Sequence, residues 1–282
     1  MKDKGAGKLH YARFATRWKN IAELKGEKVT LILSPHLDDI FLSLYATLSS
    51  GKLGKDIIGV NFFTASDSAV RTNVYTTFST IVKTSLIRMN EELEFSRVLF
   101  LQGINYLPAF MGLKDASIER YYEFIASGAI GRLPEGTARK AGLNLYNRMV
   151  ASYVRELQLG SSLAPLLRQF RSNIKNVLVP LGIGTHLDHG VIARLTDEFP
   201  RSTKLGLYAE IPYVYMSGNM SIDKLRAKAP EGFSKTTVTY FDPKKKDGLF
   251  RRIYGSQYEK RTSEAIHTVG EKLGEVVLWR HS

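Results

Sequence analysis

Two short segments of the sequence carry side chains suited to binding a metal ion and moving protons. The first, His36–Asp39, reads His-Leu-Asp-Asp and follows the apolar run 29–34 and a proline. The second, His186–His189, reads His-Leu-Asp-His and comes shortly after the apolar run 176–180. The chain has no cysteine, so histidine and carboxylate side chains would have to hold any transition metal. The two segments therefore indicate metal-assisted chemistry.

The apolar runs that precede these segments would position them. A short apolar run that ends at a proline is typical of a buried strand that stops abruptly. In open α/β sheets, ligands bind just outside the carboxyl ends of the strands. Because strands and helices alternate along the sequence, we expect an α/β fold with a Rossmann-like, mainly parallel sheet flanked by helices. The active site is expected at the C-terminal ends of its strands.

The 282 residues are expected to form a single α/β domain, 1–282. Residues 1–25 are interpreted as an irregular basic lead-in, and residues 103–140 as an insertion that lines a cleft. The expected strands are 28–34, 56–64, 97–101, 176–180, 204–211, 236–241 and 276–279. The expected helices are 11–24, 39–50, 84–97, 143–158, 161–171 and 189–198, with two more before the last strand.

The composition of the chain bears on its cellular location and on the partners that it could bind. The N-terminus lacks the apolar core of a secretory signal, and no apolar run approaches the ~18–20 residues that span a bilayer, so we expect a cytoplasmic protein. The formal charge of +13 favours an anionic partner, such as a phosphorylated or nucleotide-linked substrate, a membrane surface or nucleic acid. A solvated basic surface explains the same charge equally well.

The spacing within the segments favours one shared metal site. His36 and Asp39 are three residues apart, so they face the same side of a helical turn and can bind one ion. His186 and His189 are the candidates for a third ligand, and Asp38 is free to act as a base on a metal-bound water. Zn²⁺ suits this donor set, with Fe²⁺, Co²⁺ or Ni²⁺ as other occupants. A plainer interpretation makes each segment a helix start capped by an aspartate.

The two segments resemble the signatures of the PIG-L/LmbE-like zinc deacetylases, which remove the acetyl group from N-acetylglucosamine-type sugars. The resemblance rests mainly on Ser34–Asp39 and Pro180–His189 and extends over about residues 28–280. Weaker similarities follow in order along the chain, at Arg88–Glu91, Met111–Ala116, Tyr208–Tyr213, Tyr254–Gln257 and Leu278–Arg280.

The resemblance implies a role for each matching residue. It implies that His36, Asp39 and His189 bind zinc and that Asp38 is the general base. It also implies that His186, oriented by Asp188, stabilises the oxyanion or protonates the leaving amine. A histidine beside a carboxylate is expected to stay protonated near neutrality, as a general acid requires. The implied substrate contacts are Arg88, Asp115, Glu210 and Tyr213.

Several positions depart from the family pattern. Leu37 replaces a proline and Ile40 a glutamate, but neither change removes a ligand or the base. Lys114 also replaces a proline, and Ala209 precedes a lone Glu210, so the identity of the sugar is less certain than the reaction. The implied partner is an N-acetylated amino-sugar conjugate, with a phosphate, nucleotide or lipid carrier left open. A homo-oligomer is also left open.

Other interpretations stay open at this point. Arg88 could be a solvated helix residue paired with Glu91 or Glu92, and Asp115 could simply form a turn. The run 244–246 is interpreted as an exposed helix start, with phosphate binding as the alternative. The aromatic residues of the insertion, Tyr106, Phe110, Tyr121, Tyr122 and Phe124, could pack in the core or form a wall for a sugar ring or lipid tail.

Three other functions are also compatible with parts of the sequence. The first is a metal amidase that acts on another N-acyl bond. The second is a basic nucleic-acid-binding protein with a structural metal site, although no nucleic-acid-binding motif is legible and no nucleic acid is expected. The third is a catalytically inactive relative, which the presence of every expected ligand and base argues against.

Overall fold

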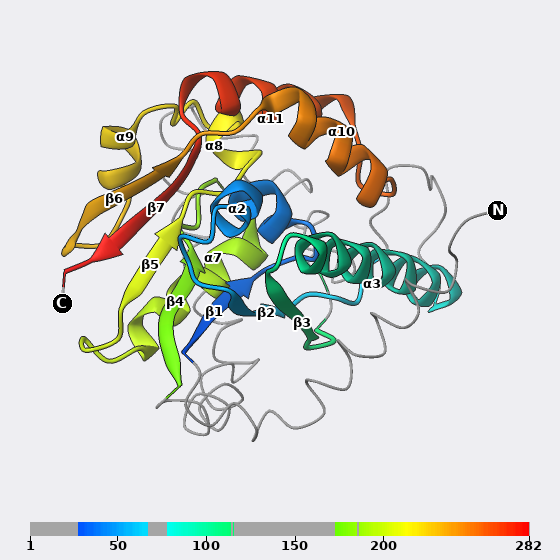
Figure 1. Cartoon of the computed structure of the whole chain (residues 1–282), viewed down its shortest axis with the longest axis horizontal. Coiled ribbons are helices and arrows are strands. Elements are labelled where there is room, and N and C mark those ends of the chain that lie inside the picture. Colours follow the sequence, from blue (N-terminus) through cyan, green and yellow to red (C-terminus); the bar gives the residue numbers. More distant parts are fainter. Residues whose placement is uncertain (1–27, 67–77, 114, 116–172, 185, 282) are drawn as a thin grey trace, which may run out of the picture.

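A seven-stranded, mainly parallel sheet forms the centre of the computed structural model, which describes residues 28–66, 78–113, 115, 173–184 and 186–281. The strand order is β3-β2-β1-β4-β5-β7-β6 (Figure 1). The first five of these strands pair in parallel, whereas β7 runs antiparallel to both β5 and β6. The predicted α/β fold class is therefore confirmed.

The elements have the following bounds. The strands are β1 (Val29–Ser34), β2 (Asp56–Asn61), β3 (Asn105–Phe110), β4 (Ile174–Pro180), β5 (Leu205–Tyr208), β6 (Phe233–Thr239) and β7 (Glu275–Arg280). The helices are α2 (Asp39–Ser49), α3 (Phe78–Leu101), α7 (Leu187–Ala193), the 3₁₀ helix η2 (Arg194–Glu198), α8 (Tyr213–Met216), α9 (Ile222–Arg226), α10 (Pro243–Ile253) and α11 (Lys260–Lys272). The helices expected at 11–24, 143–158 and 161–171 lie outside the described residues.

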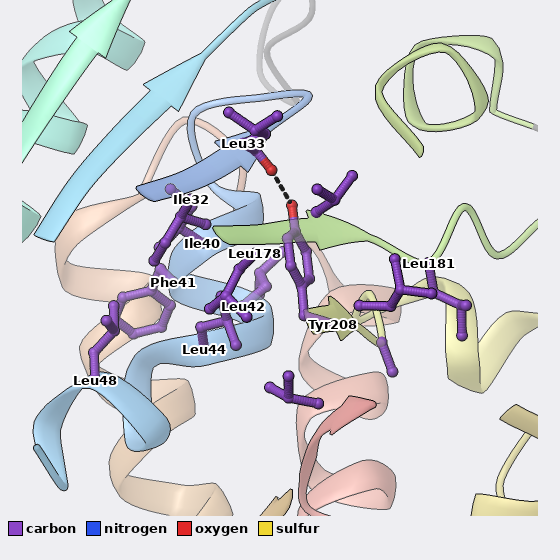
Figure 2. Close-up of a cluster of buried hydrophobic side chains, with 14 of the residues drawn as sticks. Ile32, Leu33, Ile40, Phe41, Leu42, Leu44, Leu48, Leu178, Leu181 and Tyr208 are labelled. Atoms are coloured by element: carbon purple, nitrogen blue, oxygen red, sulfur yellow. Dashed lines mark hydrogen bonds between the residues drawn. The ribbon is translucent and has the colours of Figure 1, made fainter. Parts of the chain in front are cut away.

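The core around β1 explains why this strand is apolar throughout. Every residue of β1 is buried, as expected for a strand inside a parallel sheet that is covered on both faces. Figure 2 shows side chains of β1, α2 and β4 packed together, with Ile32, Phe41 and Leu178 among them. The Tyr208 hydroxyl donates a 3.0 Å hydrogen bond to the Leu33 carbonyl, which satisfies the polar end of this buried ring.

The third strand was placed wrongly from the sequence. The run 97–101 is the last part of α3, and the strand is instead Asn105–Phe110. Glu92, Phe95, Ser96 and Leu99 are buried at helical spacing, so the apolar run continues one face of the helix. Short apolar runs do not by themselves distinguish helix from strand. The start of the expected insertion at 103 is thus an edge strand of the sheet, while residues 116–140 lie outside the described part.

The lysine run 244–246 is only partly an exposed helix start. Asp242 caps α10 by accepting a hydrogen bond from the Lys245 amide, and Lys244 and Lys245 are exposed. Lys246, however, is buried, and its ammonium group lies 2.6 Å from a carboxylate oxygen of Glu275 in β7. The interpretation of this third lysine as exposed was therefore wrong, because it forms an ion pair inside the fold.

Candidate active site

The two histidine segments meet at the reversal of strand order in the sheet. Moving outward from β1, the chain runs to β2 and β3 on one side and to β4 and β5 on the other. Open α/β sheets bind ligands at such a switch point, outside the carboxyl ends of the strands. His36 follows β1, and His186 lies between the end of β4 and the start of α7. The predicted position of the site is the position that the topology favours.

His36, Asp39 and His189 bring their ligand atoms together at this point. Asp39 Oδ2 lies 3.4 Å from His36 Nδ1 and 3.5 Å from His189 Nε2, and all three side chains are buried. Candidate ligand atoms of the three residues lie within 4.8 Å of one another. The buried His189 Nε2 has no hydrogen-bond partner among the described residues.

These separations fit a tetrahedral ion. Bonds of about 2.0–2.2 Å to nitrogen and oxygen place neighbouring ligand atoms of tetrahedral zinc about 3.4 Å apart. The donor set of two imidazoles and one carboxylate is also that of catalytic zinc sites, in which a fourth position is kept for water or substrate. The residues present therefore fit the metal that the resemblance implies.

Opposite charges stabilise one another within this group. Burial alone would raise the pKa of Asp39, but His189 and His36 outweigh it and hold that pKa well below its usual range. Burial would lower the pKa of His36, but hydrogen bonds to Asp188 and Asp39 raise it well above its ordinary value. Asp39 is thus held as a carboxylate, the form that can bind a cation.

His186 and Asp188 do not form the simple pair that the resemblance implies. Asp188 Oδ2 lies 2.9 Å from His36 Nε2 but 3.9 Å from His186 Nδ1, so its nearer histidine is His36. Burial, together with the neighbouring His36 and His189, lowers the pKa of His186 well below its ordinary value. This direction is opposite to the expected protonated acid, because burial disfavours the charged imidazolium and the two neighbouring imidazoles add to that effect.

Arg88 connects the candidate base to a second carboxylate. Its guanidinium group is buried and donates a 2.9 Å hydrogen bond to Asp38 Oδ1 and a 3.0 Å bond to Ser66 Oγ. Ser66 Oγ in turn donates to Asp115 Oδ2 at 2.7 Å. Arg88 is therefore buried rather than solvated, and within the described part of the chain its hydrogen bonds go to Asp38 and Ser66 rather than to Glu91 or Glu92. Asp115 is more than a turn residue.

Ser66 was missed by sequence reasoning. The only sequence feature that could have identified it is its position shortly after the end of an expected strand, and many polar residues share that feature. Glu91, the last residue of the Arg88–Glu91 similarity, accepts hydrogen bonds from both the amide and the hydroxyl group of Ser256, at 2.8 and 2.6 Å. Two of the weak sequence similarities are thus in contact in the fold.

Glu210 and Tyr213 lie behind and beside His189. Glu210 is fully buried, and its Oε1 lies 3.4 Å from His189 Nδ1, so it faces this candidate ligand rather than an open surface. The Tyr213 ring packs edge-on against the His189 ring at 4.5 Å between centroids. Leu37 and Ile40, the two departures in the first segment, are buried in the core. Lys114 lies outside the described residues.

Comparison with solved structures shows which proteins share this fold. N,N'-diacetylchitobiose deacetylase from Pyrococcus horikoshii matches with a TM-score of 0.54 and 15% sequence identity, over 99% of this chain and 93% of that chain. Teicoplanin deacetylase in its zinc-inhibited form matches with a TM-score of 0.51 and 17% identity, over 90% of this chain and 99% of that chain. A triple mutant of a deacetylase of the teicoplanin biosynthetic pathway gives the same TM-score at 16% identity and the same coverages.

No protein-family model matches the sequence, and no curated protein matches it. The chain has the fold of these deacetylases, so the predicted resemblance to PIG-L/LmbE-like deacetylases is confirmed at the level of the fold. Among the described residues, no helix is long and apolar enough to cross a membrane.

Proposed function

We propose that this chain is a metal-dependent hydrolase that removes the N-acetyl group from an N-acetylglucosamine-type sugar conjugate. The observation that carries the proposal is the buried group of His36, Asp39 and His189 at the switch point of the sheet, with Asp38 beside it. The shared fold supports the same reaction class, because the matched structures are described as deacetylases.

In this proposal the three ligands hold a divalent ion, with Zn²⁺ as the first candidate. When bound, zinc polarises the amide carbonyl and lowers the pKa of a water molecule, so that a nucleophile is available at neutral pH. A neighbour described as zinc-inhibited indicates that zinc interacts with a protein of this fold.

Asp38 is the proposed general base. Its side chain keeps 17% of its surface exposed, whereas the neighbouring Asp39 is at 5%, so only Asp38 remains accessible to a water molecule and a substrate. Arg88 holds Asp38 Oδ1 at 2.9 Å and thereby fixes the carboxylate. Asp38 takes a proton from the attacking water and returns it to the amide nitrogen as the C–N bond breaks, which leaves acetate and a free amine.

His186 is proposed to stabilise the oxyanion. Imidazole offers at least one N–H donor in either protonation state, so it can donate a hydrogen bond to the tetrahedral oxygen. Its side chain is 18% exposed, close to the value for Asp38, and its ring lies 4.9 Å from that of His36. Arg88, Asp115 and Tyr213 remain the proposed contacts or positioning groups on the sugar side.

The test is acetate release from N-acetylglucosamine supplied free, phosphorylated, nucleotide-linked and lipid-linked, with zinc-loaded protein. Asp38→Asn is expected to lower kcat by about 10²–10⁴-fold, the usual contribution of a general base, while it binds zinc with wild-type stoichiometry. Asp247→Asn is the matched control, because Asp247 has the same 17% side-chain exposure but lies in α10. It is expected to keep wild-type activity.

Other outcomes would point to other functions. Loss of both zinc and activity in Asp38→Asn would contradict the assignment of Asp38 as base and make it a ligand. Release of longer acyl chains, without acetate, would indicate an amidase for another N-acyl substrate. No acyl release from any of the substrates, together with steeply salt-dependent DNA binding, would favour a nucleic-acid-binding protein.

A further inference from the structure

We propose that two fully buried carboxylates, Asp188 and Glu210, are positioning residues that fix the two metal-site histidines in opposite tautomers. Asp188 would hold the proton of His36 on Nε2, and Glu210 would hold the proton of His189 on Nδ1. The inference rests on the metal site of the proposed function and assigns to both carboxylates a role other than substrate binding or orientation of His186.

The first pair is His36 with Asp188. His36 Nε2 lies 2.9 Å from Asp188 Oδ2, a normal distance for a charge-assisted hydrogen bond. The side chain of Asp188 has no exposed surface, and Asp188 lies in the first turn of α7. An ionised carboxylate only accepts hydrogen bonds, so the imidazole nitrogen facing it must carry the proton. When a bound metal displaces the other ring proton, Nδ1 presents its lone pair on the side of Asp39.

The second pair is His189 with Glu210. Glu210 Oε1 accepts the amide hydrogens of Gly182 and Ile183, at 2.8 and 3.2 Å, and lies 3.4 Å from His189 Nδ1. Gly182 has φ +74°, and a Cβ at this position would lie 2.9 Å from the Ala193 side chain. The turn after β4 thus requires glycine in order to aim its amides at the carboxylate. In the proposal Glu210 accepts a hydrogen bond from His189 Nδ1, so the lone pair that a bound metal would meet lies on Nε2, which faces Asp39.

The two pairs form the same kind of histidine–carboxylate contact, but through different ring nitrogens, Nε2 in His36 and Nδ1 in His189. Each histidine turns one nitrogen toward a buried carboxylate and the other toward the same oxygen, Asp39 Oδ2. Metal-binding histidines commonly donate their second ring N–H to a carboxylate, which fixes the ring and raises the basicity of the ligand nitrogen. Neither carboxylate is exposed, so neither is placed to touch a substrate.

The direct test reads the tautomers of the zinc-loaded wild-type protein by ¹⁵N NMR of its histidine rings. We expect a proton on Nε2 of His36 and on Nδ1 of His189. A proton on Nδ1 of His36, or on Nε2 of His189, would overturn the proposal. This measurement needs no substitution, so it does not depend on whether a variant folds.

The second test measures Co²⁺ affinity from the visible absorption of the bound ion. Asp188→Asn and Glu210→Gln are each expected to weaken binding about 10–100-fold, the usual loss for such partners of metal ligands. Glu92→Gln is the matched control, since Glu92 is equally buried but hydrogen-bonds to two tyrosines. It is expected to bind Co²⁺ as the wild type does.

The outcomes separate this inference from the proposed function. Wild-type affinity in both folded variants would overturn the positioning role while the metal site stands. A wild-type protein that binds no Co²⁺ or Zn²⁺ would overturn the metal site, and this inference with it. Weakened Co²⁺ binding in Glu92→Gln to the same extent would also overturn the inference, because the effect would then be a general consequence of losing a buried carboxyl group.

Discussion

At the scale of single residues, Arg88 shows how the site fixes the carboxylate of the proposed base, Asp38. A buried guanidinium needs partners for its donors, and here two of them bind Asp38 and Ser66. Arg88 Nη1 also lies 3.8 Å from Asp115 Oδ2. One cation thus lies between two carboxylates, which lowers the cost of burying all three charges. The planar fork of arginine suits two separate acceptors in a way that a lysine ammonium does not.

We therefore predict that Arg88→Lys lowers kcat by at least tenfold, although the charge is kept. The ammonium group cannot bind Asp38 and Ser66 in the same fork geometry, so the base loses its fixed orientation. Acetate release measures kcat and KM, and Co²⁺ absorption checks that metal affinity stays at the wild-type value. Wild-type kcat in Arg88→Lys would mean that the positive charge alone is sufficient.

The residue types of the site were predictable from the sequence, but their pairing was not. His36, Asp38 and Asp39 are consecutive or nearly so, and the strand before them fixes where they lie. The hydrogen bond between His36 and Asp188 joins positions 152 residues apart, and only the register of β1 with β4 decides it. The family resemblance implied His186 as the partner of Asp188, and the fold places His36 closer to that carboxylate.

At the scale of elements, α2 has the candidate base and ligand at its start, and its middle contacts a buried ion pair between α10 and β7. Glu275 of β7 accepts the amide hydrogens of Ala46 and Thr47, at 2.9 and 2.7 Å. Lys246 of α10 donates to the Leu42 carbonyl and to Glu275. The ion pair therefore connects α2 to the antiparallel end of the sheet. Because α2 begins at Asp39, the same contact supports the helix that carries this candidate ligand.

We predict that Lys246→Met destabilises the fold by about 3–5 kcal/mol, because Glu275 would remain buried without its counter-ion. Burial lowers the pKa of Lys246, and Glu275 opposes that shift, so the lysine depends on this partner for its charge. Urea denaturation measures the loss. The double variant Lys246→Met with Glu275→Gln is expected to recover part of it. A double variant as unstable as the sum of both singles would show that the two side chains act independently.

The boundaries of α3 and β3 show which part of the fold the sequence could not predict. Both a helix and a strand were expected before residue 101, since apolar residues at 98–101 satisfy either pattern. The strand that follows contains Pro108, which is tolerated because β3 is the edge strand of the sheet. The continuous apolar runs of β1 and β4 were predictable because both strands are central and buried.

At the scale of the whole molecule, Glu92 joins three parts of the chain that are far apart in sequence. It lies on α3 and accepts hydrogen bonds from Tyr106 of β3 and from Tyr254 at the end of α10. Gly59 of β2 makes room for this junction, because a Cβ there would overlap the Tyr106 hydroxyl. Burial raises the pKa of Glu92 to about 8, and the two tyrosine hydrogen bonds offset only part of that shift.

This junction makes global stability depend on pH. An unfolded glutamate loses its proton near pH 4.5, whereas the folded Glu92 keeps it to about pH 8. Between these values the native state binds one more proton than the unfolded state, so the free energy of unfolding falls as pH rises. The stabilisation is complete below pH 4.5 and is lost as the pH passes through 8.

We predict that Glu92→Gln removes this dependence. Between pH 5.5 and 8, the wild type is expected to lose about 3 kcal/mol of unfolding free energy relative to the variant, from about 1.4 kcal/mol per pH unit. Urea denaturation at several pH values gives both curves, and parallel curves would contradict a proton on Glu92. Tyr254→Phe tests the sign separately. With one donor fewer to the ionised form, the pKa of Glu92 should rise further, so the fall in unfolding free energy should continue to higher pH than in the wild type.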